Sequence, residues 1–143
     1  MAVRRQDALG YQFGLLSRLF DRLLENELSE FGVSPGQFPP LVMLYEQDGL
    51  TQAELCKRIL VEQPTMANTL NRMERDGLIK KQPDNKDKRQ TRIFLTDHAK
   101  NYKIQIMEKA RKVPTQAMNN LESNDREKLF NLVSKLIENL KFN

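Results

Sequence analysis

The chain has 143 residues and a mass of 16.7 kDa, which is the size of one ordinary domain. Only 39% of its residues are hydrophobic, 29% are charged and none is Trp, which predicts a helix-rich chain that completes its core with a partner. No run of ~18 apolar residues is available for a membrane span, and the N-terminus lacks the apolar stretch of a secretory signal. Cys56 stands alone, so an intrachain disulfide is excluded and a cytoplasmic location is expected.

The first predicted element is a long amphipathic helix from about Gln6 to Phe31, with apolar residues at steps of three to five. Gly32 is expected to end it, because glycine readily adopts positive φ. A second helix is predicted over Ser34–Gln47, with Ser34 as its N-cap. Pro39–Pro40 would disturb a helix interior, so the regular part is expected to begin near Phe38.

Two shorter helices follow. Thr51 is predicted to cap the third helix, with Glu54 completing a capping box, and the expected buried face is Ala53, Leu55 and Ile59. The fourth helix is predicted to start between Glu62 and Pro64 and to end at Asp76–Gly77. Its inner stripe is Met66, Leu70 and Met73, whereas its outer face carries hydrogen-bonding side chains, namely Thr65, Asn68, Thr69 and Arg72. A helix with such a face suits the major groove of DNA.

Two strands, Leu78–Gln82 and Arg92–Leu95, are predicted to enclose a hairpin at Pro83–Thr91. The net charge of the protein lies in this region. The stretch 80–92 has six basic residues and two acidic ones, a net of +4, and the remaining 17 basic and 17 acidic side chains cancel. A positive hairpin beside a helix pair predicts binding to a polyanion, with nucleic acid as the natural candidate.

The chain is predicted to be helical again from Asp97, with an inner stripe of Ile104, Met107, Ala110 and Val113 and a kink or break at Pro114. A final helix is expected after a cap at Ser123 or Asn124. Its apolar stripe consists of Leu129, Leu132, Val133, Leu136, Ile137 and Leu140. The predicted fold is therefore mostly α with a small β-wing (α+β), a winged helix-turn-helix flanked by terminal helices.

The stretch from Leu60 to Ile79, LVEQPTMANTLNRMERDGLI, followed by Asp87-Lys-Arg89 and Phe94-Leu-Thr96, resembles the MarR family of bacterial transcription regulators. The Glu-Gln-Pro-Thr opening of the fourth helix is most similar to the SlyA-like branch. The resemblance covers the whole chain. It implies a homodimer whose helical dimerisation region is 1–34 with 97–143 and whose DNA-binding domain is 35–96.

The resemblance also implies the residues that contact double-stranded DNA. On the fourth helix they are Gln63, Pro64, Thr65, Asn68, Thr69 and Arg72. In the wing, Arg89 is expected in the minor groove and Asp87 is expected to hold the hairpin and orient Arg89, with Lys86 and Lys88 beside them. The SlyA-like branch more often has Arg where this chain has Asn68, so the base preference of the family does not carry over.

The expected function is a transcriptional regulator, a repressor, that binds a pseudo-palindromic operator and is released by a small aromatic or phenolic effector. In the resembling family such effectors bind between the dimerisation helices and the winged unit. Phe13, Phe20, Phe38, Met43, Tyr45 and Met107 are each either core residues or part of such a site.

Two other functions remain open: a winged module used for protein contact, and an architectural protein that binds DNA without sequence preference. The charged turn by itself is also compatible with a merely solvated hairpin. Cys56 is expected to be buried and unreactive, although Lys57 and Arg58 would lower its pKa if it were exposed. His98 has no second ligand for zinc and no nucleophile beside it, so no enzyme activity, metal or cofactor is expected.

Overall fold

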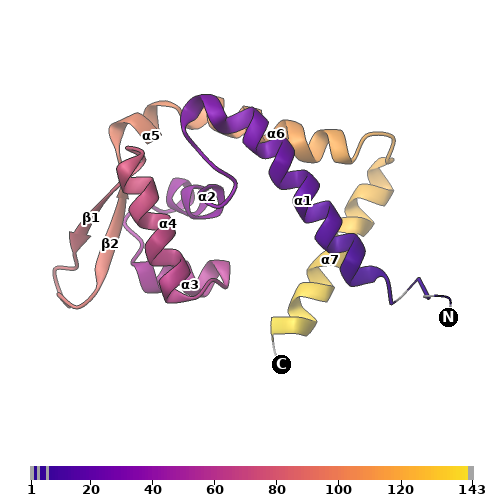
Figure 1. The fold of residues 1–143 in the computed structure, drawn as a ribbon, viewed down its shortest axis with the longest axis horizontal. Coiled ribbons are helices and arrows are strands. Elements are labelled where there is room, and N and C mark those ends of the chain that lie inside the picture. The colour runs from indigo at the N-terminus through magenta and orange to yellow at the C-terminus, as the bar shows by residue number, and fades with distance from the viewer. Residues whose placement is uncertain (1, 3, 6, 142–143) are drawn as a thin grey trace.

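The computed structural model describes residues 2, 4–5 and 7–141, and it is mostly helical with one small sheet, as predicted (Figure 1). These residues form seven α-helices, one 3-10 helix and two strands, in the order α1 (Leu9–Leu28), η1 (Ser29–Phe31), α2 (Phe38–Glu46), α3 (Gln52–Ile59), α4 (Gln63–Arg75), β1 (Ile79–Pro83), β2 (Thr91–Leu95), α5 (Asp97–Asn101), α6 (Lys103–Ala117) and α7 (Ser123–Lys141). The predicted helix start at Gln6 lies outside the described residues.

The elements divide into two groups in space (Figure 1). Helices α2, α3 and α4 and the hairpin of β1 and β2 lie together at one end of the molecule, and the long helices α1, α6 and α7 extend toward the other end. Helix α6 packs against α1. No helix among the described residues is long and apolar enough to cross a membrane.

One hydrophobic core joins the winged unit to the C-terminal end of α1 and the N-terminal half of α6. It includes Leu28, Leu41, Leu44, Leu50, Leu55, Met66, Leu70, Met73, Leu78, Ile93 and Ile106, each at most 1% exposed. Every member of the predicted inner stripe of α4 belongs to it. Burying side chains of this size contributes roughly 1.5–3 kcal/mol each, so the core fixes α4 against α3 and β1.

The entry into α2 differs in detail from the prediction. Gly32 ends η1 with φ 71°, and Pro39 falls in the first turn of α2, where a proline is tolerated, both as expected. The prediction of Ser34 as N-cap was wrong. Its backbone N–H donates to Gln37 Oε1 (3.0 Å), which closes a separate turn before the helix, so Gln37 occupies the cap position.

Three other expectations were wrong. Ala53 is exposed rather than buried. The helix predicted from Asp97 is interrupted at Tyr102, which rotates the following residues, so that Ile106 is 1% exposed and Ile104 is 70% exposed. Helix α6 continues through Pro114 to Ala117, so it does not break there, whereas a kink stays a prediction; Met118 N donates to Pro114 O (2.9 Å) in the last turn.

Strands β1 and β2 pair antiparallel, from Ile79 opposite Leu95 to Pro83 opposite Thr91. The segment after α2 extends this sheet on the side of β2. Gly49 N donates to Ile93 O (3.0 Å) and Ile93 N donates to Leu50 O (2.8 Å). An isolated two-stranded hairpin is at best marginally stable in water, so this third segment helps to hold the wing to the helices.

Candidate DNA interface

Helix α4 presents its polar face to solvent because its apolar face is used by the core. The helix begins after Glu62 and ends where Gly77 adopts φ 78°. Of the residues predicted to contact DNA, five are exposed, namely Gln63, Pro64, Thr65, Asn68 and Arg72. Thr69 is half-buried. The structure therefore places the predicted helix residues on one accessible surface, with Thr69 partly turned toward the core.

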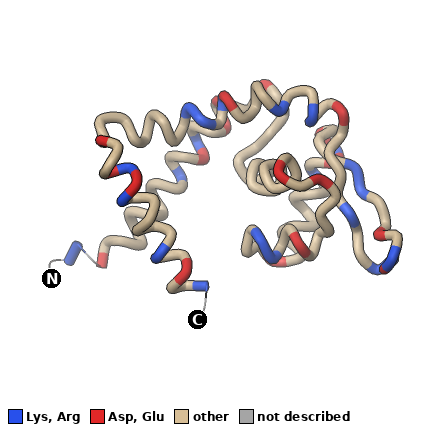
Figure 2. Tube along the Cα trace, turned by 180° about the vertical axis from the view of Figure 1, so that it is seen from behind, with Lys and Arg blue, Asp and Glu red and all other residues tan. Residues whose placement is uncertain are grey.

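The hairpin that joins β1 to β2 is closed by its own backbone. Asp84 N donates to Gln90 O (3.0 Å), and Gln90 N donates to Asp87 O (3.0 Å). Lysine and arginine residues lie along this hairpin and at its tip (Figure 2). Lys86, Lys88 and Arg89 are all exposed. The loop thus holds three of the predicted basic residues at the outer end of the wing.

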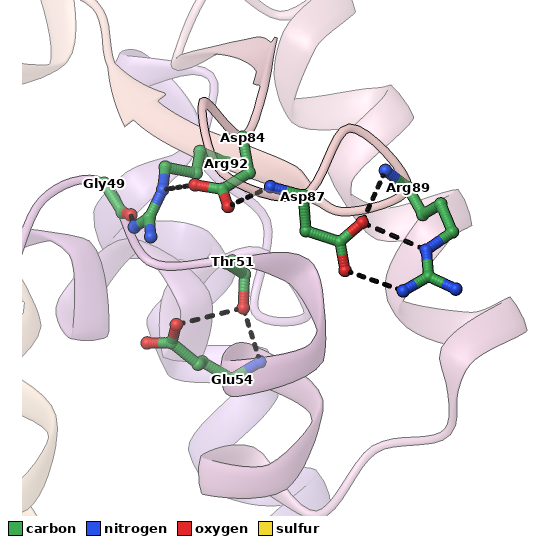
Figure 3. Close-up of polar contacts among 7 residues, drawn as sticks. All are labelled: Gly49, Thr51, Glu54, Asp84, Asp87, Arg89 and Arg92. Carbon is green, nitrogen blue, oxygen red and sulfur yellow. Dashed lines mark hydrogen bonds and ion pairs between the residues drawn. The ribbon is translucent and has the colours of Figure 1, made fainter.

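Asp87 holds Arg89 in the manner that was predicted for this pair (Figure 3). Its carboxylate accepts bonds from Arg89 N (3.1 Å), from Nε (3.0 Å) and from Nη2 (3.3 Å). The Arg89 guanidinium beside it lowers the pKa of Asp87, so the pair is ionised at neutral pH. The Arg89 side chain is nevertheless 91% exposed, which leaves the rest of its fork available to an anion.

A second acidic residue anchors the wing, and the sequence analysis missed it. Asp84 is 7% exposed, accepts a bond from Asp87 N (3.0 Å) and forms an ion pair with Arg92 Nε. Arg92 Nη1 also donates to Gly49 O (2.7 Å), in the segment that follows α2 (Figure 3). The only sequence signal was strand alternation, which puts Arg92 on the face opposite the buried Ile93 and Leu95.

Hydrogen bonds and ion pairs link five residues in a continuous series, which we call the wing brace: Gly49, Arg92, Asp84, Asp87 and Arg89. Its carboxylates have lowered pKa values, with Arg92 the largest cause for Asp84 and Arg89 for Asp87. A lowered pKa means that the stabilisation is complete above the unfolded value near 3.9 and is lost as the pH falls through the folded value. At neutral pH the brace is therefore fully formed.

Some basic side chains of the hairpin region are engaged within the protein and are not available to a ligand. Arg92 was counted with the basic hairpin, but its guanidinium is turned toward Asp84 and Gly49. Lys81 is also engaged, with Nζ donating to Asn71 Oδ1 and lying 3.9 Å from Glu74 Oε1 on α4. The charge that the wing offers to a ligand therefore comes from Lys86, Lys88 and Arg89, and from the exposed Lys80 on β1.

Cys56 and His98, which the sequence analysis considered for thiol reactivity, zinc binding and catalysis, have ordinary surroundings. Cys56 is half-buried, and burial raises its thiol pKa, the opposite of activation by Lys57 and Arg58. His98 is exposed and lies with its ring 5.0 Å from that of Tyr102. Among the described residues, no group of three or more His, Cys, Asp or Glu side chains is arranged to hold a metal ion.

A cleft of about 480 Å³ lies between α1, the turn before α2, and α6. Its lining is largely apolar and includes three of the aromatic and methionine residues noted in the sequence, Phe20, Phe38 and Met107. Asp21 and Arg111 are its charged members. Tyr45 lies elsewhere: its hydroxyl donates to Ala99 O (2.6 Å), and burial raises its pKa to about 12.

Comparison with known proteins agrees with this geometry. A model of the MarR family matches residues 33–91. Over 130 residues the chain is 25% identical to the uncharacterized HTH-type transcriptional regulator YybA of Bacillus subtilis (strain 168), a match that covers 91% of this chain and 87% of that protein. A MarR transcriptional regulator from Methanosarcina mazei Go1 superposes with a TM-score of 0.88 and 26% identity, over 94% of this chain and 98% of that one. The chain is therefore similar to MarR-family regulators, and residues 33–91 match the family itself.

Other solved structures of MarR-type regulators share the fold. Reduced AbfR bound to DNA superposes with a TM-score of 0.83 and 24% identity, covering 96% of this chain and 92% of that one. The regulator SlyA is also a structural neighbour, at 25% identity and a TM-score of 0.84, over 91% of this chain and 92% of SlyA. The predicted resemblance to MarR and SlyA regulators is thus confirmed, and the chain has the winged helix fold of these regulators.

The wing brace leads to a prediction about local order. Replacing Asp84 with Ala removes the acceptor of Asp87 N and the anionic partner of Arg92. Asp84→Ala should therefore speed hydrogen exchange of the Asp87 amide, because its protection depends on this bond. The matched variant Asp87→Ala should speed exchange at Arg89 N and leave the Asp87 position protected. Unchanged exchange at Asp87 in Asp84→Ala would show that the brace does not hold the hairpin.

Proposed function

We propose that this protein binds double-stranded DNA as a homodimer and represses transcription from a pseudo-palindromic operator. One observation carries the proposal: the exposed polar face of α4 lies beside a wing whose Arg89 is both braced by Asp87 and 91% exposed. An exposed guanidinium held in a fixed direction suits a narrow minor groove, where negative potential is concentrated. The face of α4 carries amide, hydroxyl and guanidinium groups, which match base edges in the major groove.

The long helices support the homodimer. Helix α7 has no buried residue among those described, although its sequence is strongly amphipathic. The exposed apolar side chains of α7 are Leu129, Phe130, Leu132, Leu136, Ile137 and Leu140, and those of α1 are Leu9, Tyr11, Phe13, Leu15, Leu16 and Leu19. Such a surface is larger than a soluble monomer normally exposes, so we assign 1–34 and 97–143 to dimerisation and 35–96 to DNA binding.

The homodimer determines the form of the operator. A two-fold axis would relate the two copies of α4, each in a major groove, so the half-sites should lie about 10 bp apart. Each Arg89 would then enter a minor groove outside its half-site. Contact with chromosomal DNA implies a cytoplasmic protein, and the proposed role needs no enzyme activity or cofactor.

The apolar cleft is the proposed site of a small aromatic or phenolic effector. A volume of about 480 Å³ lies within the range of small-molecule sites, and Arg111 offers a partner for an acidic or phenolic oxygen. The turn that lines the cleft with Pro35 also carries Gln37, which is 4% exposed. Gln37 Nε2 donates to Asp76 Oδ2 (2.8 Å) at the C-terminal end of α4. Through Gln37, a displacement of the turn would reach the DNA-binding helix.

The two alternative functions are less well supported. A winged module used for protein contact would not need Asp87 to hold the exposed Arg89 guanidinium outward. An architectural DNA-binding protein would use the wing charge but not the amide-bearing face of α4. It would also bind operator and random duplex with nearly equal affinity, so comparing the two affinities distinguishes it from the proposed regulator.

Substitutions in α4 and in the wing should weaken DNA binding in different ways. Asn68→Ala should weaken operator binding by about 1–3 kcal/mol and relax the preference at one base pair, because a base-edge contact is lost. Arg89→Ala should weaken binding to all duplexes, most of all those with an A·T-rich tract beside the half-site. It should also reduce the slope of log affinity against log salt by about 0.9 for each phosphate neutralisation lost.

These affinities are measured by fluorescence anisotropy over a series of salt concentrations. Arg89→Lys serves as the charge-preserving control and should restore binding only in part, since a hydrated ammonium enters a narrow groove at greater cost. The assignment is wrong if Arg89→Ala leaves affinity and slope unchanged while Lys80→Ala or Lys81→Ala abolishes binding.

Dimerisation should depend on the apolar face of α7. The double variant Leu136→Asp, Leu140→Asp should sediment as a monomer and bind DNA poorly, because each buried Leu contributes roughly 1.5–3 kcal/mol. The control Asn124→Asp, Asn131→Asp adds the same charge at polar positions of α7 and should remain a dimer. A double leucine variant that stays dimeric would refute the proposed interface.

The effector site is tested with naphthol, a fluorescent phenol that fits the cleft. Naphthol should bind the wild-type protein and weaken its affinity for operator by roughly five- to 150-fold, the usual range of allosteric coupling. Gln37→Ala should still bind naphthol but should lose most of this effect, whereas Met107→Trp, which fills the cleft, should lose naphthol binding. Equal coupling in Gln37→Ala and wild type would exclude Gln37 as the connection.

A further inference from the structure

A side-chain hydrogen bond joins the first residue of α3 to the first residue of α4. Gln52 follows the N-cap Thr51, whose hydroxyl accepts from Glu54 N (3.1 Å), and Gln63 follows the N-cap Glu62. Gln52 Nε2 donates to Gln63 Oε1 at 3.1 Å. The two side chains come from different helices, and Gln63 is exposed on the predicted DNA-binding surface. The bond therefore ties the orientation of an exposed amide to a neighbour outside α4.

The direction of this bond matters because the two ends of a glutamine side chain have opposite hydrogen-bonding character. The oxygen accepts, and the amino group has two N–H donors and no acceptor. The oxygen of Gln63 is directed to Gln52, and its amino group has no acceptor in the part of the chain that the structure describes. Gln63 consequently presents two N–H donors to whatever approaches the N-terminal end of α4.

Donors select acceptors among the base edges of the major groove. Guanine offers two acceptors there, N7 and O6, whereas adenine offers one acceptor beside an N–H donor and cytosine offers a donor. An amide that is free to rotate would accept adenine by using both of its ends. An amide whose oxygen is already held by Gln52 matches guanine better.

We propose that Gln52 is a specificity-determining residue that fixes the amide of Gln63, so that Gln63 selects guanine at one base pair of each half-site. This inference rests on the proposed DNA-binding function and adds a residue and a base preference to it. Gln52 acts through Gln63, so removing Gln52 should broaden the choice of base rather than abolish binding.

The test is selection of duplexes from a random pool by the full-length protein, followed by sequencing. The Gln63→Ala variant identifies the base pair in question as the position where the wild-type preference disappears. At that position the wild-type protein should favour guanine over adenine on the order of tenfold, the discrimination expected of a good paired contact. Gln52→Ala should flatten the preference toward equality between the two purines.

The Gln52→Glu variant tests the role of Gln52 more directly than Gln52→Ala does. A carboxylate only accepts, so it should draw the amino group of Gln63 toward itself and turn Oε1 toward the DNA. The preference should then move to adenine or cytosine, whose N6 and N4 groups donate. Ala53→Glu is the matched control, because it places the same charge on the next, exposed residue of α3. It should lower affinity for all duplexes without changing the preference.

The outcomes separate this inference from the proposed function. If the wild-type protein selects no sequence, the sequence-specific regulator and this inference both fail. If it selects a sequence but Gln63→Ala changes no position, or Gln52→Glu keeps the guanine preference, the role of Gln52 is refuted and the DNA-binding function stands. A shift in preference in Gln52→Glu that Ala53→Glu does not reproduce would establish the role.

Discussion

The position of the wing tip depends on one arginine. The buried Ile79, Ile93 and Leu95 hold the base of the hairpin to the core, but the residues from 80 to 92 bury no apolar side chain. The outer part of the hairpin must therefore be attached through polar contacts. Arg92 makes that attachment on the side of β2, with one nitrogen on Asp84 and another on the carbonyl of Gly49. Asp84 then binds Asp87 N, and Asp87 binds Arg89. The direction of the exposed Arg89 side chain therefore depends on a series of contacts that begins at Gly49, in the segment after α2.

This arrangement separates charges that hold the wing from charges that face outward. Arg92 and Lys81 are basic residues of the hairpin region, yet both are engaged with other side chains of the winged unit. Lys86, Lys88 and Arg89 remain exposed. A polyanion would therefore meet a small number of exposed cations, of which Arg89 is held by Asp87, and a held cation favours recognition of groove shape over diffuse attraction. The same unit carries Gln52 and Gln63, whose bond fixes a donor pattern at the other end of α4.

Sequence reasoning was most successful where structure is local. The stripe of Met66, Leu70 and Met73 predicted the buried face of α4 correctly, because helical periodicity alone determines which side chains share a face. The pairing of Asp87 with Arg89 also spans only two residues, and it was implied by the resemblance to MarR regulators.

The contacts that were missed join distant parts of the chain. Arg92 and Gly49 are 43 residues apart, Gln37 and Asp76 are 39 apart, and no local pattern specifies either pair. The one wrong member of the predicted stripe on α6, Ile104, has a similar origin. The interruption at Tyr102 rotates the helix that follows, and the burial of Ile106 rather than Ile104 is a consequence of tertiary packing.

The central claim is that α4 and the braced wing read DNA together from a two-fold symmetric dimer. Hydroxyl-radical footprinting on a duplex selected by the protein tests it most directly. The account predicts two protected half-sites about 10 bp apart, related by a dyad, each flanked by a protected minor-groove segment. The flanking protection should disappear in Arg89→Ala while the half-sites stay protected. Protection of a single half-site, uniform protection along the duplex, or flanking protection that survives in Arg89→Ala would contradict the account.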